Sequence, residues 1–231
     1  MSDTDVFIVS ALRSAIALGK ESGALYPLAP VDLASKVMAE TIRRAGIDPK
    51  RLDDVIWGVV TPIGDQGANL ARLATLNANF PVHVPAISIN RMCGSSQQAV
   101  HFASQAILAG DADLVLAGGT EMMSHQMLGA DYPDEFPKSI PHDLVHQGIS
   151  AEMMAEKWNL TREEQDDFAF RSHEKAASAM DAGYFGGQIL PLTIPESENG
   201  KRKSYLFHAD EGVRRRPNRQ KMGELAPAFK E

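Results

Sequence analysis

Short apolar runs alternate with helical patterns over the first half of the chain, and this alternation is the feature that most constrains the fold. Runs rich in β-branched and other apolar residues predict buried strands at 6–9, 55–60, 86–89 and 114–117. Helical spacing and helix-ending signals predict helices at 30–45, 70–77 and 94–110. Strands that alternate with helices imply right-handed crossovers and a mostly parallel sheet flanked by helices. The predicted fold class is therefore α/β.

Cys93 is the only cysteine in the 231 residues, and it lies where the strand at 86–89 gives way to the next helix. Open α/β sheets bind their ligands at the carboxyl ends of the strands. Free N–H groups at the start of a helix also stabilise a thiolate, which is the nucleophilic form of cysteine. Cys93 is therefore the leading candidate for a catalytic residue. The alternative is a buried cysteine that packs as a small apolar side chain.

Composition excludes several classes of protein. A single cysteine cannot form an internal disulfide, and no Cys/His cluster has the spacing of metal ligands. With 44% hydrophobic and 23% charged residues, the chain has the composition of a globular protein of one or two domains. No apolar run approaches the roughly 18 residues that span a bilayer, and the acidic start at 1–5 is unlike a secretory signal. We therefore expect a cytoplasmic protein that does not enter a membrane.

Charge is unevenly distributed along the chain. The net charge is -7, yet the tract at 201–221 holds eight lysine and arginine residues against Asp210 and Glu211. This tract either receives an anionic ligand or forms a solvated face. The acidic total disfavours nucleic acid as a partner.

The character of the sequence changes after the segment 118–124. The chain then runs to about Gly148 without a clear helical or strand periodicity. This predicts a long loop, and loops of this length usually have a function beyond joining two elements. Two helices follow, and the second begins with a capping box of Thr161 and Glu164 and continues toward Gly183. We expect the remainder, from residue 184, to be irregular apart from a strand at 189–194.

Several segments in order along the whole chain resemble the thiolases. Asn90-Arg91-Met92-Cys93-Gly94-Ser95-Ser96-Gln97-Gln98-Ala99 is similar to their acyl-enzyme motif. Gly118-Gly119-Thr120-Glu121-Met122-Met123-Ser124 resembles the segment that leaves the fourth strand for the loop domain of that family. The segments 147–152 and 157–166 resemble the helical part of the loop domain, and 210–214 and 227–230 resemble its exit.

The resemblance implies a thiolase-like layered α/β fold with an inserted loop domain. Residues 1–118 would form an incomplete N-terminal α/β domain, and residues 119–231 would form the loop domain that binds coenzyme A. The C-terminal thiolase domain would be absent from this chain. The first sheet would then lack its last strand, which leaves an unpaired edge and exposed apolar surface.

The resemblance also implies an acetyl-CoA C-acyltransferase of the kind used in fatty acid β-oxidation. Cys93 would carry the acyl group during thiolytic cleavage of a 3-ketoacyl-CoA, or in the reverse Claisen condensation. Coenzyme A would be a substrate, and no tightly bound cofactor and no metal are expected. Met122, Met123 and His146 would line the pantetheine channel, and Arg214 would lie near the phosphates. Otherwise, His146 is a histidine of a surface loop.

The family mechanism needs two further groups that this chain lacks, a histidine base and a second cysteine, both from the C-terminal domain. The chain alone is therefore expected to be inactive, or to work with a separate chain that supplies the C-terminal half. Family members are also dimers or tetramers, so a homo-oligomer is expected. Acyl-chain specificity and the physiological direction stay open.

Two other functions remain alternatives. One is a catalytically silent module that binds acyl-CoA or docks to a complete thiolase. The other is a condensing enzyme of the ketoacyl synthase type, which shares the cysteine elbow and the layered fold. The long loop domain and the segment 118–124 argue against the second alternative.

Overall fold

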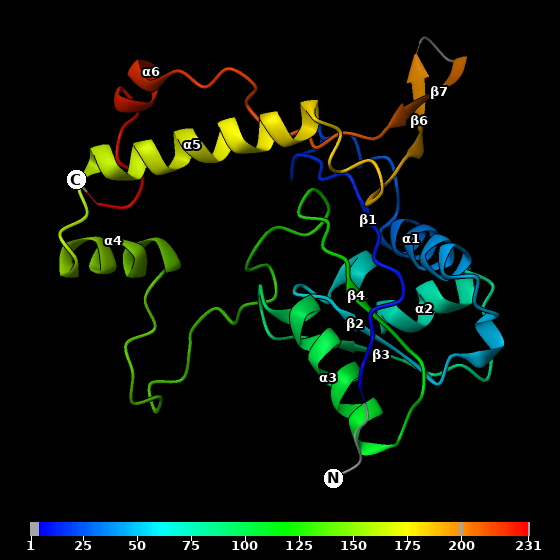
Figure 1. Cartoon of the computed structure of the whole chain (residues 1–231). Coiled ribbons are helices and arrows are strands. Elements are labelled where there is room, and N and C mark those ends of the chain that lie inside the picture. The colour runs from blue at the N-terminus through cyan, green and yellow to red at the C-terminus, as the bar shows by residue number, and fades with distance from the viewer. Residues whose placement is uncertain (1–4, 199–200, 231) are drawn as a thin grey trace. The chain divides into compact units, whose positions relative to one another are not determined.

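The computed structural model describes residues 5–198 and 201–230, which form two compact units (Figure 1). One unit comprises the chain up to Tyr132 together with Gly187–Glu211, and the other comprises Pro133–Gly186 and the chain from Gly212 onward. Each unit is described by itself below. The domain boundary expected after Gly118 remains a prediction.

A parallel three-stranded sheet forms the centre of the first unit, and its strand order is β3-β2-β4. The bounds of these strands are β2 Asp54–Gly58, β3 Ala86–Ile89 and β4 Val115–Gly119. The connecting helices are α1 Pro30–Ala45, α2 Leu70–Asn77 and α3 Ser95–Ala109, with short 3₁₀ turns η1 at Pro49–Arg51 and η2 at Gly64–Gln66. The predicted parallel α/β fold is confirmed.

Helices cover both faces of this sheet, because apolar side chains point to both faces of its strands. On one face, Met38 of α1 and Leu70 of α2 are fully buried against Val55. On the other face, Ala99 and Ala103 of α3 pack against Ile56. A sheet buried on both faces requires the near-continuous apolar strands that the sequence contains.

The strand predicted at 6–9 is wrong. Residues 5–12 belong to no strand, and the side chains of Phe7 and Ile8 are 76% and 78% exposed. A strand needs a hydrogen-bonded partner, and the described residues place no strand beside the outer edge of β4, which pairs only with β2. The unpaired edge agrees with the expectation that the first sheet lacks its last strand.

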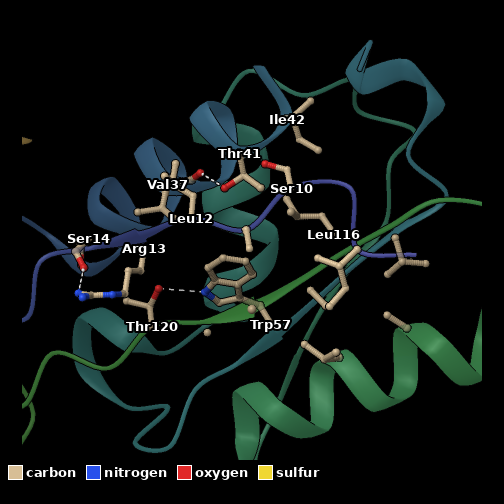
Figure 2. A pocket seen from close by; sticks show the side chains of 18 of the residues that line it. Ser10, Leu12, Arg13, Ser14, Val37, Thr41, Ile42, Trp57, Leu116 and Thr120 are labelled. Atoms are coloured by element: carbon tan, nitrogen blue, oxygen red, sulfur yellow. Dashed lines mark hydrogen bonds between the residues drawn. The ribbon is translucent and has the colours of Figure 1, made fainter. Parts of the chain in front are cut away.

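A cavity of about 890 Å³ separates the N-terminal segment from β4. Figure 2 shows its lining, with Leu12 from the N-terminal segment, Val37 and Ile42 from α1, and Leu116 from β4. Trp57 also borders the cavity, and its Nε1 donates a hydrogen bond of 2.9 Å to the Thr120 hydroxyl. The space therefore follows the edge at which the sheet is incomplete.

The strand expected at 189–194 is largely confirmed, although it is divided between two strands, whereas the expectation of an otherwise irregular chain after residue 184 is wrong. Strand β5 (Ile189–Leu190) pairs in parallel with β1 (Arg13–Ser14), and β6 (Leu192–Glu198) forms an antiparallel hairpin with β7 (Lys201–Phe207). Leu192, Ile194 and Phe207 are buried while Thr193 is exposed. This period-two alternation is the pattern of a strand with one buried face.

The second unit contains α4 Gln147–Lys157, α5 Arg162–Asp181 and α6 Arg219–Gly223. The predicted capping box is confirmed, since the Glu164 N–H donates to the Thr161 hydroxyl at 3.2 Å and the Thr161 N–H donates to the Glu164 carboxylate at 2.8 Å. Residues 119–146 contain no helix or strand beyond the end of β4, as expected. In the described parts of both units, no helix combines the length and apolarity needed to cross a membrane.

Candidate active site around Cys93

Cys93 lies in a sharp turn between the end of β3 and the start of α3, and its side chain is exposed. We call residues 90–95 the Cys93 elbow. The elbow is closed by two backbone hydrogen bonds, from the Gly94 N–H to the Arg91 carbonyl at 3.1 Å and from the Ser95 N–H to the Met92 carbonyl at 3.0 Å. Because the thiol is exposed at the carboxyl end of the sheet, the alternative of a buried packing cysteine is wrong.

A serine side chain holds the elbow from within. The Ser95 hydroxyl accepts a hydrogen bond of 2.9 Å from the Arg91 N–H and donates one of 2.6 Å to the Met92 carbonyl. Ser95 is almost fully buried, although the thiol two residues earlier is exposed. The sequence identified this segment by resemblance but gave no role to the serine.

The start of α3 packs closely on the sheet because a glycine ends β2. A Cβ atom on Gly58 would lie 2.6 Å from the Ser96 backbone nitrogen, a distance that folded proteins do not allow. The absence of a side chain at this position therefore lets the first turn of α3, which follows the elbow, approach the carboxyl end of the sheet.

Met122 and Met123 follow β4 and differ in their surroundings. Met122 is buried, and its N–H donates to the buried Gln66 side chain at 2.7 Å. Met123 is 47% exposed and lies against Gly19. Both border the cavity beside β4, whereas Cys93 is not among the residues that line it. The cavity therefore does not identify a channel to the thiol, and the role of the two methionines in lining such a channel stays a prediction.

His146 begins helix α4 in the second unit. Its Nδ1 accepts a hydrogen bond of 3.1 Å from the Gly148 N–H, which leaves the proton of the neutral ring on Nε2. The ring stacks on Phe229 with 5.3 Å between the ring centroids. His146 is thus a helix cap, a role that its position before a predicted helix could have suggested. Its place in a coenzyme A channel stays a prediction.

Arg214 also belongs to the second unit, and its guanidinium is exposed. In the part of the chain that the structure describes, the side chains of Arg214 and Arg216 make no ion pair or hydrogen bond. Arg215, in contrast, pairs with Asp181, and Arg219 pairs with Asp167. The basic tract therefore combines structural ion pairs with two cations that remain available to an anion.

His125 is a histidine to which the sequence gave no role, and both of its ring nitrogens are satisfied. Nδ1 lies 2.6 Å from Asp65 Oδ2, and Nε2 lies 2.8 Å from the Tyr26 carbonyl oxygen. Burial lowers the pKa of His125, but the hydrogen bonds to Asp65 and Tyr26 and the charge of Asp65 outweigh burial and raise the pKa above 6.5. The protonated ring fastens the chain that leaves β4 to two other loops of the first unit.

An exposed cysteine on a tight elbow, after a strand of a parallel sheet and before a helix, has the placement that a nucleophile of an α/β protein requires. The model of the thiolase N-terminal domain matches residues 6–231. The chain belongs to the thiolase family.

Individual relatives agree with this assignment. The chain is 39% identical to steroid 3-ketoacyl-CoA thiolase FadA6 of Mycobacterium tuberculosis, over 97% of this chain and 56% of that protein. It is 38% identical to a 3-ketoacyl-CoA thiolase of Serratia proteamaculans, over 97% of this chain and 58% of the relative. The crystal structure of the Bacillus anthracis acetyl-CoA acetyltransferase matches with a TM-score of 0.82 and 36% identity, over 97% of this chain and 59% of that chain. The chain thus spans somewhat more than half the length of these relatives.

Proposed function

We propose that this chain contributes the acyl-carrying half of a thiolase that cleaves 3-ketoacyl-CoA. In the proposed reaction, the Cys93 thiolate attacks the 3-keto carbon, and the bond between C2 and C3 breaks. The bonding electrons pass to the acetyl-CoA enolate, which takes up a proton and leaves as acetyl-CoA. The thiol of a second coenzyme A then displaces Cys93 from the acyl thioester, and the shortened acyl-CoA leaves. The observation that carries this proposal is the exposed Cys93 thiol on its elbow.

Other residues of the chain support binding and charge stabilisation in this scheme. The Cys93 N–H, at the start of α3, is proposed to donate to the developing oxyanion. Arg214, together with Arg216, is proposed to bind the phosphates of coenzyme A, because both guanidinium groups are exposed and unpaired among the described residues. Met122, Met123 and His146 are proposed to contact the pantetheine.

The same reaction requires a base for the thiol and a proton donor for the enolate, and the 231 residues contain no second cysteine. We propose that polypeptide beyond these residues supplies both groups, with a separate C-terminal half as the working hypothesis. A positioned acid or base accelerates proton transfer about 10²- to 10⁴-fold. The 231-residue chain by itself is therefore expected to turn over substrate at least about 10²-fold more slowly than a complete thiolase.

Labelling of Cys93 tests the proposal on the chain as it exists. The purified chain is treated with bromoacetyl-CoA and, separately, with iodoacetamide, and the alkylated residue is located by mass spectrometry. We expect bromoacetyl-CoA to modify Cys93 at least about 10-fold faster than iodoacetamide does, since bound coenzyme A raises the local concentration of the electrophile. Excess coenzyme A should remove this advantage, and Cys93→Ser should remove the label. Equal rates for the two reagents and no protection by coenzyme A would contradict the proposal.

A catalytically silent acyl-CoA-binding module is the second candidate, favoured by the free cations of the basic tract. The two functions differ in acyl transfer. With acetyl-CoA, a retained nucleophile gives acetyl-Cys93 and free coenzyme A, whereas a silent module binds acetyl-CoA without forming the thioester. The family match over residues 6–231 disfavours the ketoacyl-synthase alternative.

A further inference from the structure

The turn before Cys93 contains a residue in an unfavourable backbone conformation. Met92 has φ of +49°, in the left-handed region that residues with a side chain rarely adopt. Because this turn sets the direction in which the next residue leaves the backbone, the position of the Cys93 thiol depends on groups that keep Met92 in this conformation.

The Asn90 side chain holds Met92 and a neighbouring strand end at the same time. Its Oδ1 accepts a hydrogen bond of 2.8 Å from the Met92 N–H, and its Nδ2 donates one of 2.8 Å to the Val60 carbonyl. Val60 follows β2, the strand beside β3. A carboxamide is suited to this position because it offers one acceptor and one donor, whereas a carboxylate offers acceptors only.

Glu121 binds the other backbone polar group of Val60, its N–H. The Val60 N–H donates to Glu121 Oε2 at 2.7 Å, and the second carboxylate oxygen accepts a hydrogen bond of 3.1 Å from the Gln66 side chain. Gln66 is 1% exposed, and its own oxygen accepts the Met122 N–H at 2.7 Å. The hydrogen bonds thus connect the ends of β3, β2 and β4 in a row, from the Cys93 elbow to the chain that leaves β4.

We propose that Asn90 and Glu121 are positioning residues for Cys93. Asn90 keeps Met92 in the left-handed conformation, and Glu121 fixes Val60, to which Asn90 is anchored. Neither residue is proposed to touch the substrate. The interpretation of Cys93 as an acyl carrier rests on the proposed function, whereas the positioning of the elbow can be measured independently of it.

A rescue experiment tests Asn90 on the purified full chain. Asn90→Ala removes both hydrogen bonds, so exchange of the Met92 amide should accelerate about 10-fold or more. The rate ratio of bromoacetyl-CoA to iodoacetamide at Cys93 should fall about 10-fold, because a displacement of about 1 Å can lower a reaction rate up to 10²-fold. Met92→Gly, added to Asn90→Ala, should restore most of the ratio, since glycine adopts positive φ readily. Met92→Ala is the matched control, and it should restore nothing.

Glu121→Gln tests the part of this hydrogen-bond network that lies next to β4, and it substitutes no residue of the Cys93 elbow. Glutamine keeps the size of the side chain but cannot accept hydrogen bonds from both the Val60 N–H and the Gln66 amide group as oriented in this structure. We expect exchange of the Val60 amide to accelerate, and the labelling ratio to fall about 3-fold or more. Glu163→Gln, at an exposed position of α5, serves as control and should change neither quantity.

The outcomes separate the positioning inference from the proposed function. Unchanged amide exchange and an unchanged labelling ratio in folded Asn90→Ala would overturn the inference, and so would equal rescue by Met92→Gly and Met92→Ala. If the wild-type chain shows no preference for bromoacetyl-CoA, the proposed function fails. In that case, the iodoacetamide rate at Cys93 decides the inference, which is supported only if Met92→Gly, and not Met92→Ala, restores the wild-type rate in the Asn90→Ala background.

Discussion

Gly119 at the end of β4 lies so close to Ser96 of α3 that a Cβ atom on the glycine would overlap the serine hydroxyl oxygen. The same Cβ would lie 2.8 Å from the Gly58 carbonyl oxygen. The helix that follows Cys93 therefore rests on two glycines, one at the end of each of two adjacent strands. This packing explains in physical terms why β4 ends in a glycine.

Gly119→Ala is expected to lower the free energy of unfolding by about 1–3 kcal/mol, because the added methyl group must displace the start of α3. Urea unfolding followed by circular dichroism measures the change. Gly187→Ala is the matched control, since a Cβ there would meet no atom within 4 Å. Equal stability of Gly119→Ala and Gly187→Ala would contradict the close packing.

The interaction of His125 with Asp65 predicts a dependence of stability on pH. The pKa of His125 is raised above its ordinary value of 6.5, so the protonated ring stabilises the fold fully below pH 6.5. This contribution is lost as the pH rises through the pKa of the folded state. When the pH is raised from below to above that pKa, the free energy of unfolding should fall more for the wild type than for His125→Gln.

NMR titration of the His125 ring gives the pKa directly. His101, which is exposed, serves as the internal comparison. A pKa of His125 at or below 6.5 would contradict the ion pair.

Asp210 fastens the N-terminal segment to the chain after β7. Its carboxylate accepts hydrogen bonds from Arg13 at 2.8 and 3.0 Å and from the Ile16 N–H at 2.8 Å. Asp210→Asn is expected to lower the free energy of unfolding by about 1 kcal/mol, because Arg13 is one-third exposed and water screens the pair. Urea unfolding measures this loss, with Asp111→Asn, an exposed substitution on the same unit, as control.

The pH dependence of the same interaction has the opposite sign to that of His125. The Arg13 guanidinium, helped by the Ile16 N–H and opposed by burial, lowers the pKa of Asp210 below 3.8. The stabilisation is therefore present above pH 3.8 and is lost as the pH falls through the pKa of the folded state. If the difference in unfolding free energy between the wild type and Asp210→Asn stayed constant as the pH fell through the pKa of Asp210, this account would be contradicted.

The free cations of the basic tract predict which arginines affect binding of coenzyme A. Arg214→Ala combined with Arg216→Ala is expected to weaken coenzyme A about 10-fold, a loss of about 1.4 kcal/mol. Arg215→Ala should have a smaller effect, because Arg215 is already paired with Asp181. Isothermal titration calorimetry at two salt concentrations tests this, since phosphate contacts weaken with salt. An equal loss of affinity for coenzyme A in both variants would contradict the expectation that the ion pair with Asp181 makes Arg215 less important for binding.

Local patterns predicted much of the fold. The strand at 86–89 and the helix at 70–77 have the expected bounds, and Thr161 begins its helix with the expected capping box. These features depend on residues within one or two turns of each other, so the sequence carries them directly. The position of Cys93 between a strand and a helix follows from the same patterns.

The failures share a different cause. The apolar run at 6–9 has the composition of a strand, but a strand also needs a partner, and the described residues provide none beside it. The start of β6 lies within the strand predicted at 189–194, but β7 was missed because its basic residues obscured its alternation. The roles of Asn90 and Glu121 could not be predicted, because their common partner Val60 lies 30 and 61 residues away along the chain.

The sequence by itself determined the α/β class, the family and the cysteine at the carboxyl end of a strand, because these depend on local periodicity and on motifs in order. Only the tertiary structure decided that this thiol is exposed and that three strand ends are joined around it through Val60. Hydrogen bonds such as these form between groups that are distant in sequence, and their geometry exists only after the strands have paired.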